Sequence, residues 1–272
     1  MSQNLLGTSV DDVVRSVLDA EPGELFVVNP AGETVEELVD AANAYEGELP
    51  SIRLLGDERT LKDVTDDFIV ASNAANLVEA GALELRVFDG DARSSMLVTE
   101  DRTVALVDVG GLVGGLTTDD AEFAATAYDA VADDWAAAEP FTLRTPAIDR
   151  VRQTLDEDIS PDVESDFEQV LASMETARGD GDGLDEVTVS LLVAAKNREL
   201  LYDISKWGED VGIASKATFS RTKTKLEDLG LIDTEKVPID VGRPRLRLKL
   251  ADGRLEDAPP AELASVAQSV LS

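Results

Sequence analysis

Residues 214–230 combine basic and hydroxyl side chains at helical spacing. The apolar residues Phe219, Leu226 and Leu229 can share one face of a helix, and the polar side chains then point elsewhere. Lysine and arginine bind phosphates, and arginine, serine and threonine also bind the edges of bases. The stretch therefore predicts a DNA-recognition helix. The alternative is an amphipathic core helix with a solvated basic face.

Five polar side chains of this helix are candidates for DNA contact. They are Lys216, Thr218, Ser220, Arg221 and Lys225. An arginine can bind a guanine through two hydrogen bonds, and Arg221 is the residue best placed for this. Lys216 is expected to bind phosphate. Lys223 falls near the apolar face, where such helices commonly carry leucine, so its aliphatic stem is expected to lie along that face.

The residues around this stretch predict the elements that would position it. Apolar spacing predicts helices over about 186–196 and 199–210, and Gly212 suits the turn before the recognition helix. Ser215 suits the first position of the recognition helix, and Gly230 suits a left-handed residue that ends it. This order of elements is typical of a helix-turn-helix protein.

Two predicted strands follow, over 231–237 and 245–250, and make the expected fold a winged helix-turn-helix. In the second strand, leucines alternate strictly with basic residues, which predicts one buried face and one basic face. A Gly-Arg-Pro tripeptide precedes it at the expected wing tip, where an arginine can enter a narrow minor groove. The candidate DNA contacts of the wing are Arg243, Arg245 and Arg247. The alternative is a proline-stiffened turn with solvated arginines.

The distribution of charge supports this interpretation. The 272 residues carry a formal net charge of −32, with 56 Asp and Glu against 24 Lys and Arg. Residues 185–252 nevertheless hold 12 basic and 12 acidic residues, so half of the basic residues lie in a quarter of the chain. The other acids are dispersed through the sequence. This favours the salt adaptation of a halophile over an acidic tail or a DNA-mimicking surface.

The chain has no Cys and no His. Disulfides, thiolate metal sites, cysteine nucleophiles, Ser-His-Asp triads and HExxH zinc sites are therefore excluded. We expect no catalytic residues, no metal and no cofactor, and hence no enzyme. The sequence also lacks an apolar run that could span a membrane and lacks a signal peptide, so we expect a cytoplasmic protein without membrane contact.

The first half of the chain alternates predicted strands and helices, which is typical of an α/β domain with a mixed, mostly parallel sheet. The first predicted helix covers 5–20, and the predicted strands 95–99 and 103–109 form an antiparallel hairpin. The segment from Gly110 to Gly115 is expected to be a flexible turn between a strand and a helix. Buried strands are predicted at 25–29, 52–56 and 83–88.

These patterns divide the chain into four expected parts. Residues 1–145 form an α/β sensor or dimerisation domain, and 146–184 form a helical connector with a linker rich in Gly and Asp. Residues 185–252 form the winged helix-turn-helix DNA-binding domain, and 253–272 contain a last helix.

The segment 198–230 begins with Arg-Glu-Leu-Leu-Tyr-Asp-Ile-Ser-Lys-Trp-Gly. Together with the α/β first half, it resembles the haloarchaeal transcriptional regulator TbsP family, and the resemblance covers most of the chain. It implies a winged-helix DNA-binding regulator of central carbon metabolism, linked with the sugar-responsive TrmB regulators.

A second likeness concerns residues 86–107, which resemble the phospholipase-D-like segment of TrmB-type sensor domains. In the related enzymes the motif is His-x-Lys-x4-Asp. Here Ser94 stands at the His position and Met96 at the Lys position, and only Asp101 remains. The likeness implies a phospholipase-D-like fold used for binding or dimerisation, because no covalent phosphohistidine can form.

Three functions remain open from the sequence. The first is a sequence-specific regulator that binds double-stranded promoter DNA as a homodimer and responds to a small metabolite or a TrmB-like regulator. The second is an adaptor that acts through another DNA-bound regulator and uses the helices expected at 162–178 and 260–271 for protein contacts. The third is an α/β hydrolase with a winged-helix appendage, in which Asp101 would be essential.

Overall fold

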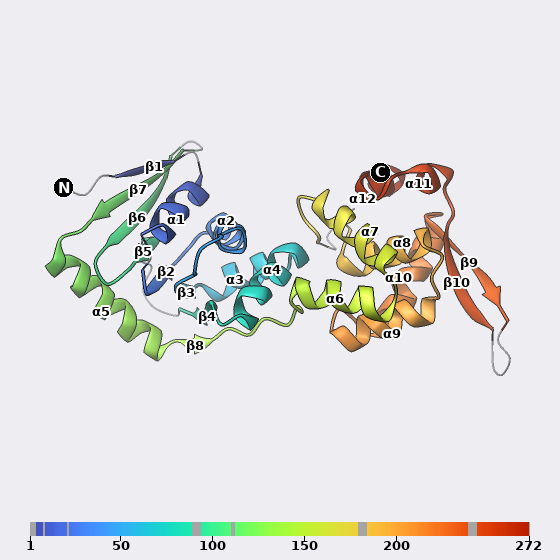
Figure 1. Ribbon diagram of the computed structural model, residues 1–272, viewed down its shortest axis with the longest axis horizontal. Helices are drawn as coiled ribbons and strands as arrows, with labels where there is room; N and C mark the ends of the chain where they lie inside the picture. The colour runs from blue at the N-terminus through green and yellow to red at the C-terminus, as the bar shows by residue number, and fades with distance from the viewer. Residues whose placement is uncertain are drawn as a thin grey trace. The chain divides into compact units, whose positions relative to one another are not determined.

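The chain divides into two compact units in the computed structural model (Figure 1). Unit 1 comprises Met1–Asp66 and Asn73–Leu143, and unit 2 comprises Asp67–Ser72 and Arg144–Ser272. None of the described helices is both long and apolar enough to cross a membrane. The finer division into four parts stays a prediction. The structure describes residues 4–7, 9–20, 22–88, 94–109, 112–178, 184–238 and 244–271.

Unit 1 is built on a mixed sheet. Its strands are β1 (Leu5–Gly7), β2 (Glu24–Val28), β3 (Ser51–Gly56), β4 (Leu83–Val87), β5 (Met96–Val98), β6 (Thr103–Val109), β7 (Leu112–Thr118) and β8 (Glu139–Pro140). Among the described residues the order is β1-β7-β6-β5-β2-β3-β4-β8. The neighbours β2, β3 and β4 are parallel, and the other pairs are antiparallel. The α/β class predicted from the sequence is confirmed.

Helices cover both faces of this sheet, which explains why consecutive residues are buried in β2 (Leu25 to Val28) and at the end of β3 (Leu54 to Gly56). The helices are α1 (Val10–Leu18), α2 (Gly32–Asn43), α3 (Glu58–Thr65), α4 (Phe68–Glu79) and α5 (Ala121–Ala137). On the α5 face, Val131 and Trp135 pack on Phe26 and Val98 of the sheet. On the opposite face, α1 buries all five of its valine and leucine side chains.

Two predictions for unit 1 were wrong. Residues 5–7 form strand β1 instead of the start of a helix, and residues 112–115 belong to β7 instead of a turn. Gly110 and Gly111 lie outside the described residues. The reason is tertiary. A side chain at Gly115 would come within 3.1 Å of Leu5, so the glycine allows β1 to pair along β7.

Unit 2 is mainly helical. Its elements are α6 (Ile148–Asp158), α7 (Pro161–Ala172), α8 (Glu186–Lys196), α9 (Leu201–Val211), α10 (Lys216–Asp228), β9 (Ile232–Val237), β10 (Arg245–Leu250), α11 (Gly253–Asp257) and α12 (Pro260–Leu271). Helix α8 is buried from Val187 to Ala195, and α7, α9, α10, α12 and β10 pack around it. The helices α8, α9 and α10 and the strands β9 and β10 confirm the winged helix-turn-helix.

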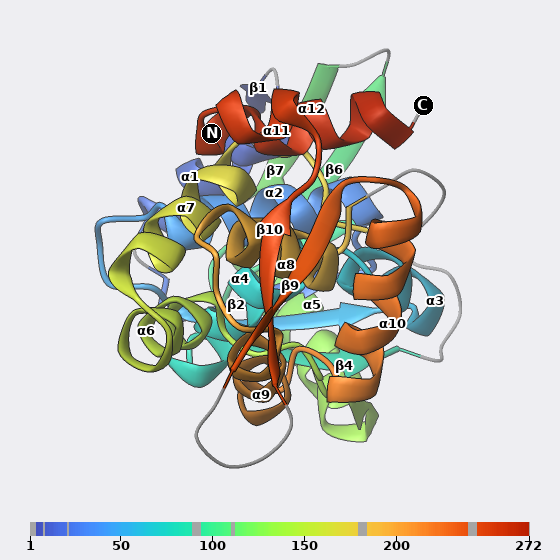
Figure 2. The ribbon, with the colours of Figure 1, turned by 90° about the vertical axis from the view of Figure 1, so that its right-hand side faces the viewer.

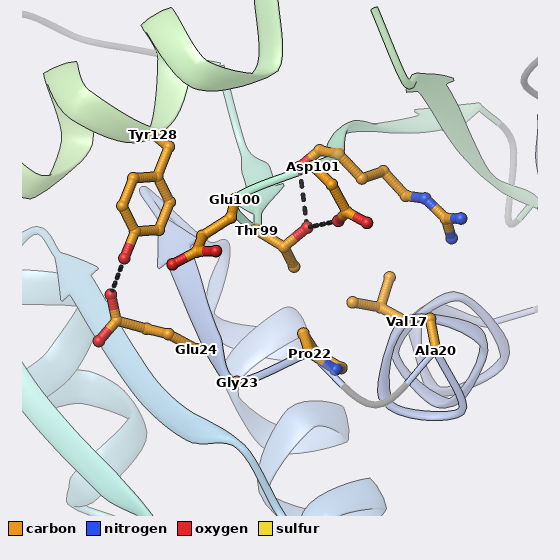
Figure 3. Close-up of a pocket in the computed structure, with 10 residues that line it drawn as sticks. Val17, Ala20, Pro22, Gly23, Glu24, Thr99, Glu100, Asp101 and Tyr128 are labelled. Carbon is orange, nitrogen blue, oxygen red and sulfur yellow. Dashed lines mark hydrogen bonds between the residues drawn. The ribbon is translucent and has the colours of Figure 1, made fainter. Parts of the chain in front are cut away.

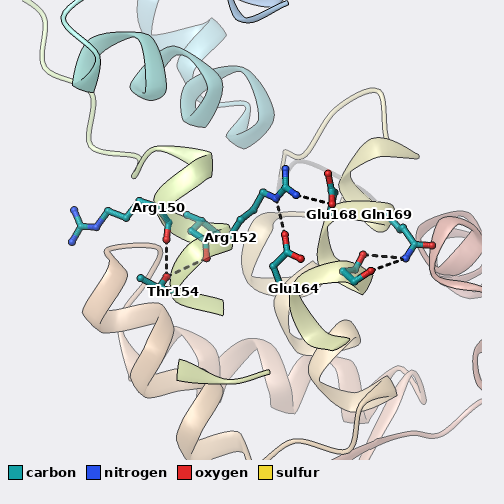
Figure 4. A network of polar contacts seen from close by, with 8 residues as sticks. Arg150, Arg152, Thr154, Glu164, Glu168 and Gln169 are labelled. Carbon is teal, nitrogen blue, oxygen red and sulfur yellow. Dashed lines mark hydrogen bonds and ion pairs between the residues drawn. The ribbon is translucent and has the colours of Figure 1, made fainter. Parts of the chain in front are cut away.

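Helix α6 is joined to its neighbours by polar contacts. The Arg152 guanidinium lies 2.8 Å from Glu164 and 2.7 Å from Glu168 of α7 (Figure 4). On the other side, the Trp207 indole of α9 donates a 2.9 Å hydrogen bond to Thr154. These contacts tie the first helix of unit 2 to the helix-turn-helix.

The apolar faces of α7 and α12 are also part of unit 2. Phe167 and Val170 of α7 are buried in the same core as Leu263 and Ala267 of α12, and the two helices pack on each other. The two helices expected to make protein contacts therefore use these faces inside the unit.

One close contact sets the distance between α9 and α10. Gly208 lies in the middle of α9, and the Phe219 ring of α10 is fully buried against it. A methyl group at Gly208 would lie only 2.3 Å from two ring carbons of Phe219. Glycine inside a helix costs about 1 kcal/mol of stability relative to alanine. The close packing of α9 on α10 that Gly208 allows offsets this cost.

We predict that Gly208→Ala lowers the free energy of unfolding of unit 2, because α9 and α10 must separate to admit the methyl group. Overpacking costs about 1–3 kcal/mol and the helix propensity of alanine returns about 1 kcal/mol, so the net loss should be at most about 2 kcal/mol. Denaturant unfolding followed by the fluorescence of the buried Trp207 measures it.

Gly253→Ala in α11 is the matched control, because nothing lies within 4 Å of a methyl group at that position. If both variants unfold at the wild-type denaturant concentration, the Gly208–Phe219 contact does not constrain the two helices.

Candidate nucleic-acid interface

The turn and the two ends of α10 have the geometry that the sequence predicts. Gly212 ends α9 with a φ of +97°, a left-handed value that glycine adopts without strain. The Ser215 hydroxyl accepts a 3.2 Å hydrogen bond from the Thr218 amide at the start of α10. Gly230 follows the helix with a φ of +72°, and the amides of Gly230 and Leu231 bond back into its last turn.

Burial defines the outward face of α10. Phe219 and Leu226 are fully buried and point towards α8 and α9. The residues on the opposite side are all exposed: Ala217, Ser220, Arg221, Thr224, Lys225 and Asp228. Leu229 is 41% exposed, so the expectation that it joins the apolar face was wrong. It lies just beyond the last helical residue, where the 3.6-residue period no longer applies.

The five candidate contacts of α10 differ in their surroundings. Ser220, Arg221 and Lys225 lie on the outward face, and within the described part of the chain the two cations form no ion pair. Thr218 is half-buried, and its hydroxyl contacts the Ser215 hydroxyl at 3.0 Å and accepts from Arg221 at 3.3 Å. Lys216 forms a 2.7 Å ion pair with Glu209 of α9.

The Lys216–Glu209 pair is solvent-exposed on both sides. The hydrogen bond between them raises the pKa of Lys216 and lowers the pKa of Glu209. Glu209 also accepts from the Lys216 backbone amide at 3.3 Å. A phosphate that approaches this end of α10 must therefore compete with a carboxylate already in place.

Lys223 occupies the inward position expected from the sequence. Its side chain is only 12% exposed, and its ammonium lies 2.7 Å from Glu227 one turn further along α10. Glu227 in turn accepts a 2.9 Å hydrogen bond from Thr234 of β9. The lysine therefore connects the recognition helix to the wing through Glu227, and its charge is not available on the outward face.

The wing is the antiparallel pair of β9 and β10 (Figure 2). In its register Arg247 lies opposite Glu235, and Lys249 lies opposite Asp233. Leu248 and Leu250 are buried, as the alternation predicts. The chain before α9 adds to the same ribbon, because Leu248 donates a 2.8 Å hydrogen bond to the Glu199 carbonyl. Sequence analysis missed this third strand-like segment, whose two residues are too few to show a period.

Each cation of β10 has an acidic partner. Arg245 lies 3.3 Å from Asp203 and stacks on the Tyr202 ring at 4.4 Å. Arg247 is 3.7 Å from Glu235, which also pairs with Arg198 at 3.1 Å. The third pair joins Lys249 and Asp233 at 2.9 Å, and it raises the pKa of Lys249. Arg243 lies outside the described residues.

Ala217, Thr224 and the acids of β9 belong to this surface and were not among the predicted contacts. An exposed alanine or threonine methyl is a suitable contact for the methyl group of thymine. The acids carried a signal, because Asp233 and Glu235 alternate at the spacing of Lys249 and Arg247.

Comparison with known proteins assigns both units. A family model described as "Transcriptional regulator TbsP-like, N-terminal" matches residues 2–146, and one described as "Transcriptional regulator TbsP-like, C-terminal HTH domain" matches residues 147–268. The chain belongs to the TbsP-like transcriptional regulators. The resemblance noted from the segment 198–230 is thereby confirmed at the level of the family.

Other comparisons add little to the TbsP-like assignment. No curated protein matches the chain. Among the solved structures, a similar one is TrmBL2, an archaeal chromatin protein whose structure is described as showing a novel mode of DNA binding. It is 14% identical with a TM-score of 0.36, and the match covers 52% of this chain and 54% of that chain. A TM-score this low supports no further statement about this TbsP-like chain.

The N-terminal unit of this TbsP-like protein contains a cavity of about 400 Å³ beside β2 and the β5–β6 turn (Figure 3). The Tyr128 hydroxyl donates a 2.5 Å hydrogen bond to Glu24 on its wall, and this bond raises the pKa of Tyr128 to about 12. Arg53 pairs with the same carboxylate at 2.9 Å. Glu24, at the start of β2, therefore joins Tyr128 and Arg53 through one carboxylate at the cavity wall.

Asp101, the remaining residue of the phospholipase-D-like pattern, also lines this cavity. It accepts a 2.9 Å hydrogen bond from Thr99 in the β5–β6 turn. Met96 packs against the α5 cluster, and Ser94 is exposed. Asp101 and Met96 therefore have structural contacts in the β5–β6 hairpin of unit 1.

We predict that Glu227→Gln lowers the free energy of unfolding of unit 2 by about 1 kcal/mol, because the Lys223 ammonium would lose its charged partner at a mostly buried site. Asp210→Asn is the matched control. Asp210 also pairs with a lysine four residues away at 2.7 Å, but that pair is more than half exposed and its loss should have no measurable effect. Equal effects of the two variants would show that burial of the Lys223 pair is unimportant.

Proposed function

We propose that this TbsP-like protein binds specific promoter DNA by placing α10 in the major groove. The observation that carries the proposal is the outward face of α10, where Arg221 and Lys225 are exposed without acidic partners in the described part of the chain. They lie four residues apart, so both face the same groove. Ser220 and the methyl group of Ala217 complete a surface suited to base edges.

The wing has a second role in this proposal. Arg245, Arg247 and Lys249 lie on one face of β10, and phosphate oxygens would exchange places with Asp203, Glu235 and Asp233. Exposed ion pairs contribute little, so this exchange costs little. In salt of about 1 M the Debye length is only about 3 Å, and acidic surfaces further away barely repel DNA.

The habitat and the target genes that we propose are supported by the sequence. The dispersed acidic residues support a halophilic archaeal protein of the cytoplasm, and the TbsP resemblance supports genes of central carbon or sugar metabolism as targets. The cavity beside Tyr128 supports a small metabolite as effector, with a TrmB-like regulator as the alternative signal. Binding to two half-sites would require a homodimer.

We predict that Arg221→Ala weakens binding to promoter DNA about 10- to 100-fold and relaxes sequence preference, because one bidentate base contact is lost. Lys225→Ala should weaken binding to all sequences by a smaller and more uniform factor. Band-shift titration against promoter fragments in molar potassium salt measures both.

Arg59→Ala is the control for these titrations, because Arg59 is an exposed arginine on α3 of unit 1. The proposed use of α10 fails if Arg221→Ala and Arg59→Ala bind every promoter fragment as well as the wild type does.

We predict that Glu235→Gln tightens DNA binding about 3- to 10-fold at moderate salt, because Arg198 and Arg247 lose a competing carboxylate. The gain should shrink in molar salt, where the ion pairs are already screened. Glu79→Gln, an exposed site at the end of α4, removes the same charge and separates a local effect from net charge. An equal gain from both variants would contradict competition within the wing.

A further inference from the structure

The hairpin of β6 and β7 exposes an apolar surface on unit 1. Eight large apolar side chains of the described residues are exposed, and four of them lie in this hairpin. They are Val107 at 38%, Val109 at 68%, Leu112 at 62% and Leu116 at 50%. A fifth, Phe123, is 56% exposed near the start of α5, the helix that follows β7 directly.

These side chains lie on one face of the sheet. Val109 pairs with Leu112, Val107 with Gly114 and Ala105 with Leu116, and directly opposed residues of an antiparallel pair point to the same side. We call these six residues the β6–β7 apolar face. Met96 pairs with Ala105 and packs in the α5 cluster, so this is the face that α5 covers further along the sheet. The part of this face that α5 covers stops before the β6–β7 hairpin.

The β6–β7 apolar face carries no charge, which is unusual in this chain. Acidic residues make up 56 of the 272 residues, yet the only acid in the two strands, Asp108, points to the opposite face. An isolated apolar side chain on a surface is ordinary, but a contiguous group marks an interaction site. A second acidic chain would be repelled from most of this surface and could approach closely here.

The shape of the face also suits contact with the same face on a second copy of the chain. Gly114 lies between Leu112 and Leu116 on the same strand, so a gap separates two leucines, and Val107 stands opposite the gap. Two such faces related by a twofold axis can insert the leucines of each into the gap of the other. Isologous contacts of this kind bring the same residues together from both partners.

We propose that two copies of this protein associate face to face through the β6–β7 apolar faces. The four large side chains of this face expose on the order of 400 Å² per copy, about half of what one partner buries in a standard interface. Polar residues around the face would supply the rest, as they do at the rim of other interfaces. The inference rests on the homodimer of the proposed function and not on its DNA contacts.

The occupant is a second copy and not a basic partner, because in the molar salt of the proposed function a contact between opposite charges would be screened. Apolar burial is not screened by salt, whereas the repulsion between two chains of charge −32 is. The association should therefore strengthen as salt rises. A contact with a basic partner would weaken under the same change.

The experiment compares wild type with Leu112→Glu/Leu116→Glu by sedimentation equilibrium in potassium chloride of about 1 M. The wild type should be a dimer, and the variant should raise the dissociation constant at least about 100-fold, because both leucines of each copy leave the contact. Val78→Glu/Ala130→Glu adds the same two charges at exposed helix positions of unit 1 and should remain a dimer.

A second measurement does not depend on the folding of the charged variant. The chain has no cysteine, so Leu112→Cys provides a single thiol, and a short bis-maleimide should join two copies into a covalent dimer. Val78→Cys should give little of this product. A monomeric wild type, a charged variant that stays dimeric, or equal cross-linking at both positions would each overturn the interface.

These outcomes are separate from the proposed function. A wild type that binds promoter DNA but remains monomeric overturns only the interface. A dimer that is joined through Leu112 but binds no promoter DNA overturns only the DNA-binding proposal.

Discussion

Repulsion between carboxylates is the constraint under which every contact of this chain forms. Acidic residues outnumber basic ones by more than two to one, so most cations are drawn into pairs, as Arg152 is between Glu164 and Glu168. The winged helix-turn-helix follows the same rule on its wing. Against this background, the two neighbouring cations on the outward face of α10, which have no acidic partner among the described residues, are informative, although the same pair on a basic protein would mean little.

Packing decides which cations of α10 are exposed to solvent. The Phe219 ring against Gly208 fixes the rotation of α10 about its own axis, and that rotation places Arg221 outward and Lys223 inward. Lys223 is held at its inward position by Glu227 and through it by Thr234 of β9. A polar connection between recognition helix and wing thus takes the place of a leucine. The geometry of the outward face of α10 depends on one apolar contact and one mostly buried ion pair.

Much of this arrangement follows from periodicity in the sequence, because helices such as α1 and α10 and the strand β10 bury one regular face. The wrong predictions have different causes. Residues 5–7 pair with 113–115 across more than a hundred residues, and no local pattern records such a pairing. Residues 112–115 continue a local hairpin with β6 in spite of their glycines. The acidic partners of the wing arginines are equally non-local, since Asp203 and Arg245 lie on different elements. Residue type therefore identified the basic surface, but not which of its cations pair with acidic residues.

High salt would affect both proposed surfaces, the outward face of α10 and the β6–β7 apolar face. In molar salt a phosphate contact gains little from counterion release, so a single helix-turn-helix with few unpaired cations would bind weakly. The proposed dimer would make the second DNA contact intramolecular, and the effective concentration that results would not depend on screening. The β6–β7 apolar face and the outward face of α10 thus address the same difficulty from two sides. In the two proposals, the first uses burial that salt does not weaken, and the second confines charge to the few positions that would meet base edges and phosphates.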